Sequence, residues 1–94
     1  MDNLFAKVVT TCNVAEQMKD DKQFADFVSV SLGRYLECDW GDLCDDDRAA
    51  NDNAVKNEDR ILASYEHSEH DDWKIWIITE WDRSVTTILF PSEY

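Results

Sequence analysis

The chain has 94 residues, with 21 Asp and Glu against 9 Lys and Arg, and its formal net charge is −12 at pH 7. This charge disfavours nucleic acids and anionic membranes as direct partners, because both attract proteins through Lys and Arg. The composition is 44% hydrophobic with two Gly and one Pro, which is typical of a folded domain and excludes an acidic disordered tail.

The first sixty residues have the periodicity of helices. An Asn and a Glu three residues apart fit a capping box and predict a short helix over residues 13–19. A second box, at residues 20–23, opens the most regular amphipathic stretch, which predicts a helix through Leu36. The three acids at residues 45–47 suit a helix N-terminus and open a third helix through about Lys56, whose thin apolar face predicts a surface position.

The pattern changes to strands after Arg60. Residues 61–66, 73–79 and 85–90 are rich in β-branched and aromatic side chains, and the short connections between them predict an antiparallel meander. Residues 7–10 are a candidate fourth strand. The expected fold is therefore α+β, with two to three N-terminal helices packed on a three-stranded or four-stranded antiparallel sheet. The expected organisation is one domain over residues 1–94, with a helical part at 11–57 and a sheet part at 60–91.

The second strand of this meander is apolar on both faces. Trp73, Ile75 and Ile77 alternate with Trp76 and Ile78, which predicts a central strand or one whose second face is covered. Three helices can cover one face of so small a sheet. The other face is then a candidate surface for a homodimer.

The N-terminal residues Met1 to Lys7 include an acid and no long apolar run, so no secretory leader is expected there. No window approaches the roughly 20 apolar residues that span a membrane. Cys12, Cys38 and Cys44 are odd in number and form no CxxC pair, which favours reduced thiols over a disulfide framework. We therefore expect a cytoplasmic protein.

Two metal sites were considered from the residue types. Cys38, Cys44, His67 and His70 are acceptable zinc ligands, but they follow no recognisable spacing. The acids at residues 45–47 lack the alternating ligands, central Gly and closing Glu of an EF-hand loop. No metal and no other cofactor is expected.

The negative charge is unevenly distributed. Residues 39–59 carry eight acids and two bases, which is half of the excess. Such a run is most often a solvated face that keeps a small protein soluble. The alternative is a surface that presents carboxylates with phosphate-like spacing to a basic nucleic-acid channel, because carboxylates attract the same Lys and Arg.

Two residues of this segment have an expected structural role. Trp40, beside Gly41, is expected to anchor the loop between the second and third helices onto the core, since Trp is highly buried on average. Asn is unusual inside a helix, so Asn51 is expected to form a hydrogen bond with the loop at residues 40–42.

The C-terminal part resembles a known family. The segments that carry the resemblance are 39–42, 51–52, 60–65, 74–80, 82–89 and 91–94. They are similar to small proteins of bacterial plasmids, integrative elements and phages; the first 38 residues match only in layout. Trp81 stands where such members have a small or acidic residue. The family implies no established reaction, but it implies a mobile-element setting in which small acidic proteins act against host defence systems.

A ribonuclease site is the alternative chemistry. The residues for it would be Glu80, Arg83, Ser84, Thr86, His67 and His70. Glu or His would act as general base and Arg would bind the phosphoryl oxygens. A ribonuclease must attract a polyanion, whereas Glu80 and Asp82 flank the Arg. We therefore expect Arg83 to pair with Glu80 or Asp82 and to order the turn.

The function expected from charge and resemblance is non-enzymatic. The protein would bind a basic surface of a host nucleic-acid-handling defence protein, as an anti-CRISPR or anti-restriction inhibitor and DNA mimic. The partner would be a CRISPR effector or restriction enzyme. The alternatives left open are a homo-oligomeric accessory protein and a small RelE- or barnase-like ribonuclease. The residues expected to carry the contact are Asp39, Asp42, Asp45, Asp46, Asp47, Asp52 and Glu58.

Overall fold

The computed structural model describes residues 7–70 and 72–94, and the expectation about a leader falls largely on residues 1–6, outside these ranges. The described chain forms three α-helices, four strands and a short 3₁₀ helix, which confirms the α+β fold with helices ahead of the meander. The elements in chain order are β1 Val8–Thr10, α1 Cys12–Asp20, α2 Lys22–Leu36, α3 Asp45–Asn57, β2 Ile61–Glu66, β3 Lys74–Thr79, β4 Thr86–Leu89 and η1 Pro91–Glu93. None of the helices in these ranges combines the length and the apolar character needed to cross a bilayer.

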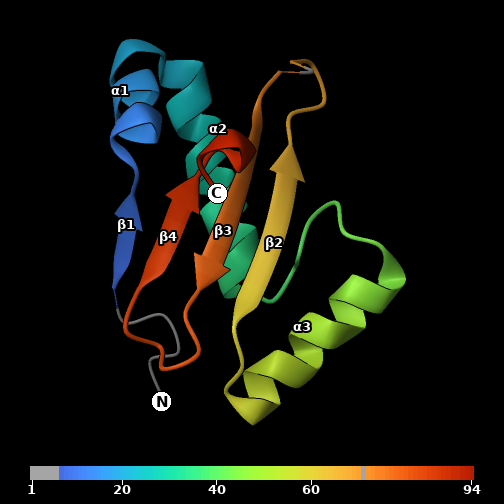
Figure 1. Ribbon diagram of the computed structural model, residues 1–94. Helices are drawn as coiled ribbons and strands as arrows, with labels where there is room; N and C mark the ends of the chain where they lie inside the picture. Colours follow the sequence, from blue (N-terminus) through green and yellow to red (C-terminus); the bar gives the residue numbers. More distant parts are fainter. Residues whose placement is uncertain (1–6, 71) are drawn as a thin grey trace.

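The four strands form one mixed sheet in the order β1-β4-β3-β2. β2, β3 and β4 are the expected antiparallel meander, and β3 is internal as its two apolar faces predicted. The fourth strand is β1, which pairs with β4 in parallel from Val8↔Thr86 to Thr10↔Ile88. The first and last strands are therefore neighbours, and the helices connect opposite edges of the sheet (Figure 1).

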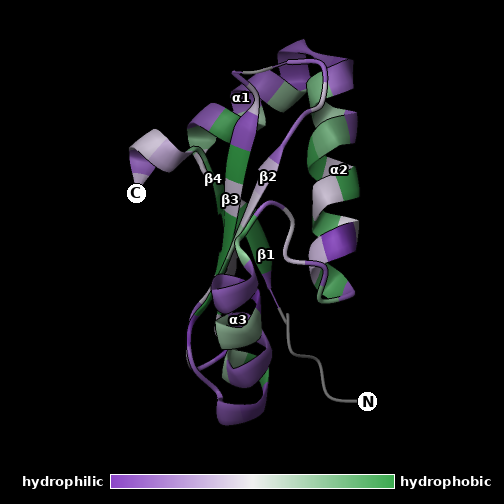
Figure 2. Cartoon of the chain, turned by 90° about the vertical axis from the view of Figure 1, so that its right-hand side faces the viewer, coloured by the Kyte–Doolittle hydropathy of each residue, from purple (hydrophilic) through white to green (hydrophobic). Residues whose placement is uncertain are grey.

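The core lies between the sheet and helices α1 and α2. Figure 2 shows α2 on one side of the sheet and the C-terminal segment on the other. From the strands, Ile75 and Ile77 point into this core and are fully buried, together with Val14 of α1 and Phe24 of α2. Each such apolar side chain contributes roughly 1.5–3 kcal/mol when buried.

The third helix does not lie on that face. α3 lies beside β2, at the edge of the sheet, so the expectation that three helices cover one face is wrong for this helix (Figure 2). Its buried residues are only Asn51 and Ala54, which is too little apolar surface to pack across a sheet.

The second face of the sheet, expected as a candidate dimer surface, carries contacts from the chain's own C-terminal residues. The Tyr94 ring lies 5.4 Å from the Trp76 ring, and the Arg60 guanidinium lies 5.0 Å from the centre of the Tyr94 ring. These contacts cover part of the face. Self-association through it stays a prediction.

The helix starts differ slightly from the expected capping boxes. Thr11, and not Asn13, is the N-cap of α1, and its hydroxyl also donates to the Glu93 carboxylate at 2.9 Å. Asp21, one residue after the expected Asp20, is the N-cap of α2. Thr11 is preferred because it also continues the pairing with β4, through its N–H bond to Ile88. A tertiary contact thus decides between two local caps.

A chain of buried hydroxyls joins α2 to the sheet. Tyr35 Oη lies 2.6 Å from Thr79 Oγ1, which lies 2.8 Å from Thr86 Oγ1. All three residues are fully buried. Burial raises the pKa of Tyr35 to about 12, because an ionised phenol here would place a charge in the core.

This pKa shift predicts a loss of stability at alkaline pH. An unfolded Tyr loses its proton near pH 10 and the folded Tyr35 near 12, so the stabilisation is complete below pH 10 and is lost as pH rises to about 12. Urea unfolding across this range should show a decrease of up to about 3 kcal/mol from Tyr35. Tyr35→Phe should reduce the decrease, and Tyr94→Phe, at an exposed Tyr, should not. An unchanged decrease in Tyr35→Phe would contradict the assignment.

Candidate partner-binding surface

Helix α3 begins with three consecutive carboxylates. Asp45, Asp46 and Asp47 form its first turn, where negative charge interacts favourably with the helix dipole. All three are exposed. Within the described part of the chain, neither a hydrogen bond nor an ion pair involves their side chains. These carboxylates are therefore available to a partner.

Glu58 lies at the opposite end of the same helix. It is exposed and adopts a left-handed conformation, with φ 57°, as the C-cap of α3. The 13 residues of α3 span about 20 Å, so the expected acids extend along the helix instead of meeting at one point. Figure 2 shows both ends of α3 as hydrophilic, with paler residues between them.

A side-chain amide attaches the middle of α3 to β2. Asn51 Nδ2 donates to the Leu62 carbonyl at 2.7 Å, and the Leu62 N–H donates to Asn51 Oδ1 at 3.4 Å. The expectation that Asn51 binds the loop at residues 40–42 is therefore wrong. Asn51 lies on the buried side of the helix, which faces the strand and not the loop.

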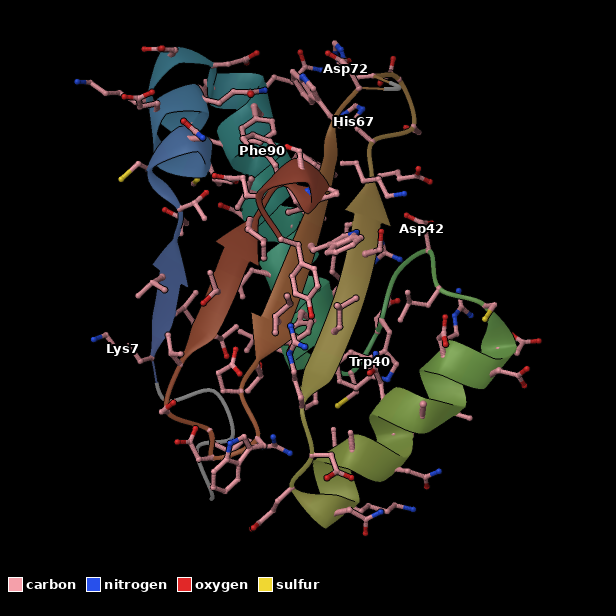
Figure 3. The ribbon with its side chains drawn as sticks, viewed as in Figure 1. Lys7, Trp40, Asp42, His67, Asp72 and Phe90 are labelled. Carbon is pink, nitrogen blue, oxygen red and sulfur yellow. The ribbon has the colours of Figure 1, made fainter. Side chains whose placement is uncertain are left out.

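The loop before α3 closes the rest of the β2 edge. The Asp42 N–H donates to the Ser64 carbonyl at 2.8 Å, and Asp42 Oδ2 accepts from the Glu66 N–H at 2.8 Å. Asp42 thus acts as a short extension of the sheet (Figure 3). The side chain of Arg48 then donates to the Gly41 carbonyl at 2.8 Å and joins the loop to the first turns of α3.

Trp40 anchors this loop, as expected. Its side chain is 3% exposed and packs edge-on against Tyr35, at 5.4 Å between ring centres. The indole Nε1 donates to Asp52 Oδ1 at 2.9 Å. Figure 3 shows Trp40 between β2 and α3. Asp52, expected to contact a partner, therefore also has a structural role.

Asp39 is paired within the chain. Arg34 donates to both of its carboxylate oxygens, at 2.8 and 3.2 Å, and the Gly41 N–H donates to Oδ1. The hydrogen bond from Arg34 is the main reason that the pKa of Asp39 lies below its ordinary value. The seven expected acids thus divide into two groups. Asp39, Asp42 and Asp52 hold the fold together, whereas Asp45, Asp46, Asp47 and Glu58 form what we call the α3 acidic surface.

The residues of a ribonuclease site are not brought together. His67 lies by the turn between β2 and β3, whereas Glu80 and Ser84 lie at the turn between β3 and β4 (Figure 3). The six residues of β3 separate these turns by roughly 20 Å. Thr86 is fully buried among core hydroxyls.

Arg83 has a structural role at the end of α3. Its Nη1 donates to the Asp59 and Glu80 carbonyls at 2.7 and 3.2 Å, and its Nη2 donates to the Ala54 carbonyl at 2.9 Å. The expected pairing with the carboxylate of Glu80 or Asp82 is therefore wrong. The carbonyls at a helix C-terminus carry partial negative charge, so the Ala54 carbonyl, which also accepts from the Asp59 N–H at 3.0 Å, is a suitable acceptor for a guanidinium.

The thiols and imidazoles considered for zinc are also dispersed. Cys12, Cys38 and Cys44 are free and exposed, so none of the three thiols is buried in the core. Among residues 7–70 and 72–94, no three His, Cys, Asp or Glu side chains converge as a group of metal ligands.

Gly41 is a position that the sequence pattern did not single out. Its φ is +75°, and a Cβ built there would lie 2.2 Å from the Ser64 carbonyl oxygen and 2.7 Å from the Tyr65 ring. Only Gly allows the loop to approach β2 this closely. In the sequence, the only local sign of this close approach is that a single Gly follows Trp40.

Gly41→Ala should destabilise the protein by at least about 2 kcal/mol, because the left-handed conformation and the steric clash both oppose a side chain. Gly33→Ala is the matched control, since its Cβ would meet nothing within 4 Å in an exposed helix position. That variant should gain up to about 1 kcal/mol. Urea unfolding measures the change in unfolding free energy for the two variants. Equal changes in Gly41→Ala and Gly33→Ala would contradict the role of Gly41.

Asn51→Ala should leave the Leu62 N–H and carbonyl without partners at the sheet edge, at a loss of about 1–3 kcal/mol in unfolding free energy. Asn53→Ala, at an exposed position of the same helix, should be neutral or slightly stabilising because Ala favours helix. Thermal and urea unfolding of the two variants compare them directly. A similar small effect for both would show that the amide does not hold α3.

Comparisons with known proteins identify no relative of this chain. No family model matches the chain, and no match is found among curated proteins or among solved structures.

Proposed function

We propose that this protein is a non-enzymatic interaction protein, which binds a basic surface of a nucleic-acid-handling protein through the α3 acidic surface. One observation carries the proposal. Asp45, Asp46 and Asp47 are exposed and without ion pairs among the described residues, on a helix whose position is held by hydrogen bonds along its length. A carboxylate that has no partner inside the protein retains its full attraction for Lys and Arg outside it.

The rigidity of the helix favours such binding. Arg48 near the start of α3 binds the Gly41 carbonyl, and Asn51 in its middle binds the Leu62 carbonyl. Arg83, in the turn between β3 and β4, binds the Ala54 carbonyl near the C-terminal end of α3. A surface that is ordered before binding loses less conformational entropy on association. Its negative field also accelerates the encounter with a basic partner.

The partner class follows from the chemistry of a carboxylate. It offers a guanidinium the same bidentate geometry as a phosphate, so basic channels that hold nucleic acid are suitable targets. With the resemblance to mobile-element proteins, this favours a CRISPR effector or a restriction enzyme in the cytoplasm of a bacterial host. The acidic protein would occupy the channel as a DNA mimic.

The ribonuclease alternative has less support. Its residues lie at opposite ends of β3, and Arg83 donates to backbone carbonyls. The acids around the turn would also repel an RNA substrate.

The test is neutralisation of the first turn of α3. Asp45→Asn, Asp46→Asn and Asp47→Asn together should weaken binding to a purified CRISPR effector–guide RNA complex or restriction enzyme roughly tenfold at low salt. The salt dependence of the association rate should decrease as well. Biolayer interferometry with and without competing target DNA measures both effects.

A matched control changes the net charge equally elsewhere. Glu16→Gln, Asp20→Asn and Asp26→Asn alter exposed acids of α1 and α2 and should weaken binding less than threefold. Equal losses of affinity in the two triple variants would show that binding depends on net charge and not on the position of the carboxylates, which would contradict the role of α3. If target DNA does not compete with the protein for binding, the DNA-mimic proposal is contradicted.

A further inference from the structure

Trp81 has an exposed aromatic side chain that lies outside the hydrophobic core of the described residues. It lies in the turn between β3 and β4 and is 66% exposed, whereas Trp40 and Trp73 are almost fully buried. A Trp side chain buries some 150–250 Å² when it is covered. Trp is among the residue types that are enriched at the positions contributing most of the binding energy in protein interfaces.

The turn that carries Trp81 is well ordered by hydrogen bonds. The Arg83 N–H donates to the Glu80 carbonyl at 2.9 Å, and the Ser84 N–H donates to Asp82 Oδ1 at 3.0 Å. The Arg83 guanidinium also donates to the Trp81 carbonyl at 3.4 Å. The backbone of this turn is therefore held in one conformation, which lowers the backbone entropy lost when a partner binds the turn.

Arg83 also brings this turn against the end of α3. Its Nη1 binds the carbonyls of both Trp81 and Asp59, so the two backbones are adjacent. Figure 1 shows the turn and the C-terminal end of α3 at the same end of the molecule. Two elements that are distant in sequence thus form one surface.

Both elements of this surface carry carboxylates. Glu80 and Asp82 flank Trp81 in the turn, and Glu58 and Asp59 come from the end of α3. Together with Trp81 they form what we call the Trp81 surface. Two of the nearby cations are engaged within the chain, because Arg83 binds carbonyls and the Arg60 guanidinium lies over the Tyr94 ring. Lys56, in the last turn of α3, is exposed and adds one positive charge beside the four carboxylates.

We propose that the Trp81 surface binds an apolar side chain flanked by Lys or Arg on a protein partner. The inference rests on the proposed function and adds an apolar contact to the charged one. Charge complementarity favours this occupant, because the carboxylates attract the flanking cations while the indole packs on the apolar group. A nucleic acid stacking a base on Trp81 is disfavoured, since the same carboxylates repel its phosphates.

The Trp81 surface is continuous with the α3 acidic surface, because Glu58 belongs to both. The two are expected to contribute differently to binding. The exposed Asp residues at the other end of α3 accelerate association, whereas a buried indole slows dissociation.

The test uses two synthetic peptides with the same Lys and Arg content, one with a central Leu-Phe pair and the other with Gly-Ser in its place. The protein is labelled with 5-fluorotryptophan, and Trp81→Phe assigns the Trp81 resonance in the fluorine NMR spectrum. The apolar peptide should bind at least about fivefold more tightly and should shift the Trp81 resonance. The resonances of Trp40 and Trp73, which are buried, should stay in place.

Trp81→Ala should bind both peptides equally, with unchanged thermal stability because the side chain is exposed. Asp45→Asn, Asp46→Asn and Asp47→Asn together should preserve the preference for the apolar peptide. Equal affinity for the two peptides, an unshifted Trp81 resonance or no binding of either peptide would overturn the inference. In the binding assay with the effector complex, weaker binding by the triple Asp variant but unchanged binding by Trp81→Ala would support the proposed function and overturn this inference.

Discussion

The outer edge of β2 is closed by the Asn51 amide and by the Asp42 loop, where a further strand would otherwise pair. An open edge exposes backbone N–H and carbonyl groups that pair readily with other chains, and closing it removes that hazard. The amide bonds to Leu62 require α3 to lie along the edge. Because α3 is placed there, α1 and α2 are the helices of the described residues that cover the core face of the sheet.

Attachment at an edge explains how so polar a helix can be part of the fold. α3 buries little besides Asn51 and Ala54, and hydrogen bonds from Arg48 and Arg83 to carbonyls hold its two ends. Most of its circumference is therefore free to carry charge. A helix packed across the sheet would have needed an apolar stripe in place of several of these acids.

The acidic segment has two kinds of carboxylate. Asp39 and Asp42 are hydrogen-bonded to the chain, and the latter completes the sheet edge. Asp45, at the start of α3, has no such bond among the described residues. A count of charge along residues 39–59 treats them alike, whereas the structure separates acids that maintain the fold from acids that face solvent. The latter, with the Trp81 turn at the other end of α3, form the surface through which we propose that a partner binds.

Local patterns in the sequence determine the secondary structure here. A local enrichment in β-branched and aromatic residues predicts residues 61–66 as β2 without error at either end, and the two-faced pattern of β3 predicts its internal place. The partners of Asn51 and Arg83 were not predictable, because those hydrogen bonds join residues 11 and 29 positions apart whose spacing has no periodic signature. The sequence by itself therefore determined the elements and the excess of charge. Only the tertiary structure decided that α3 lies at the sheet edge and which of its carboxylates remain available, since both depend on contacts between distant parts of the chain.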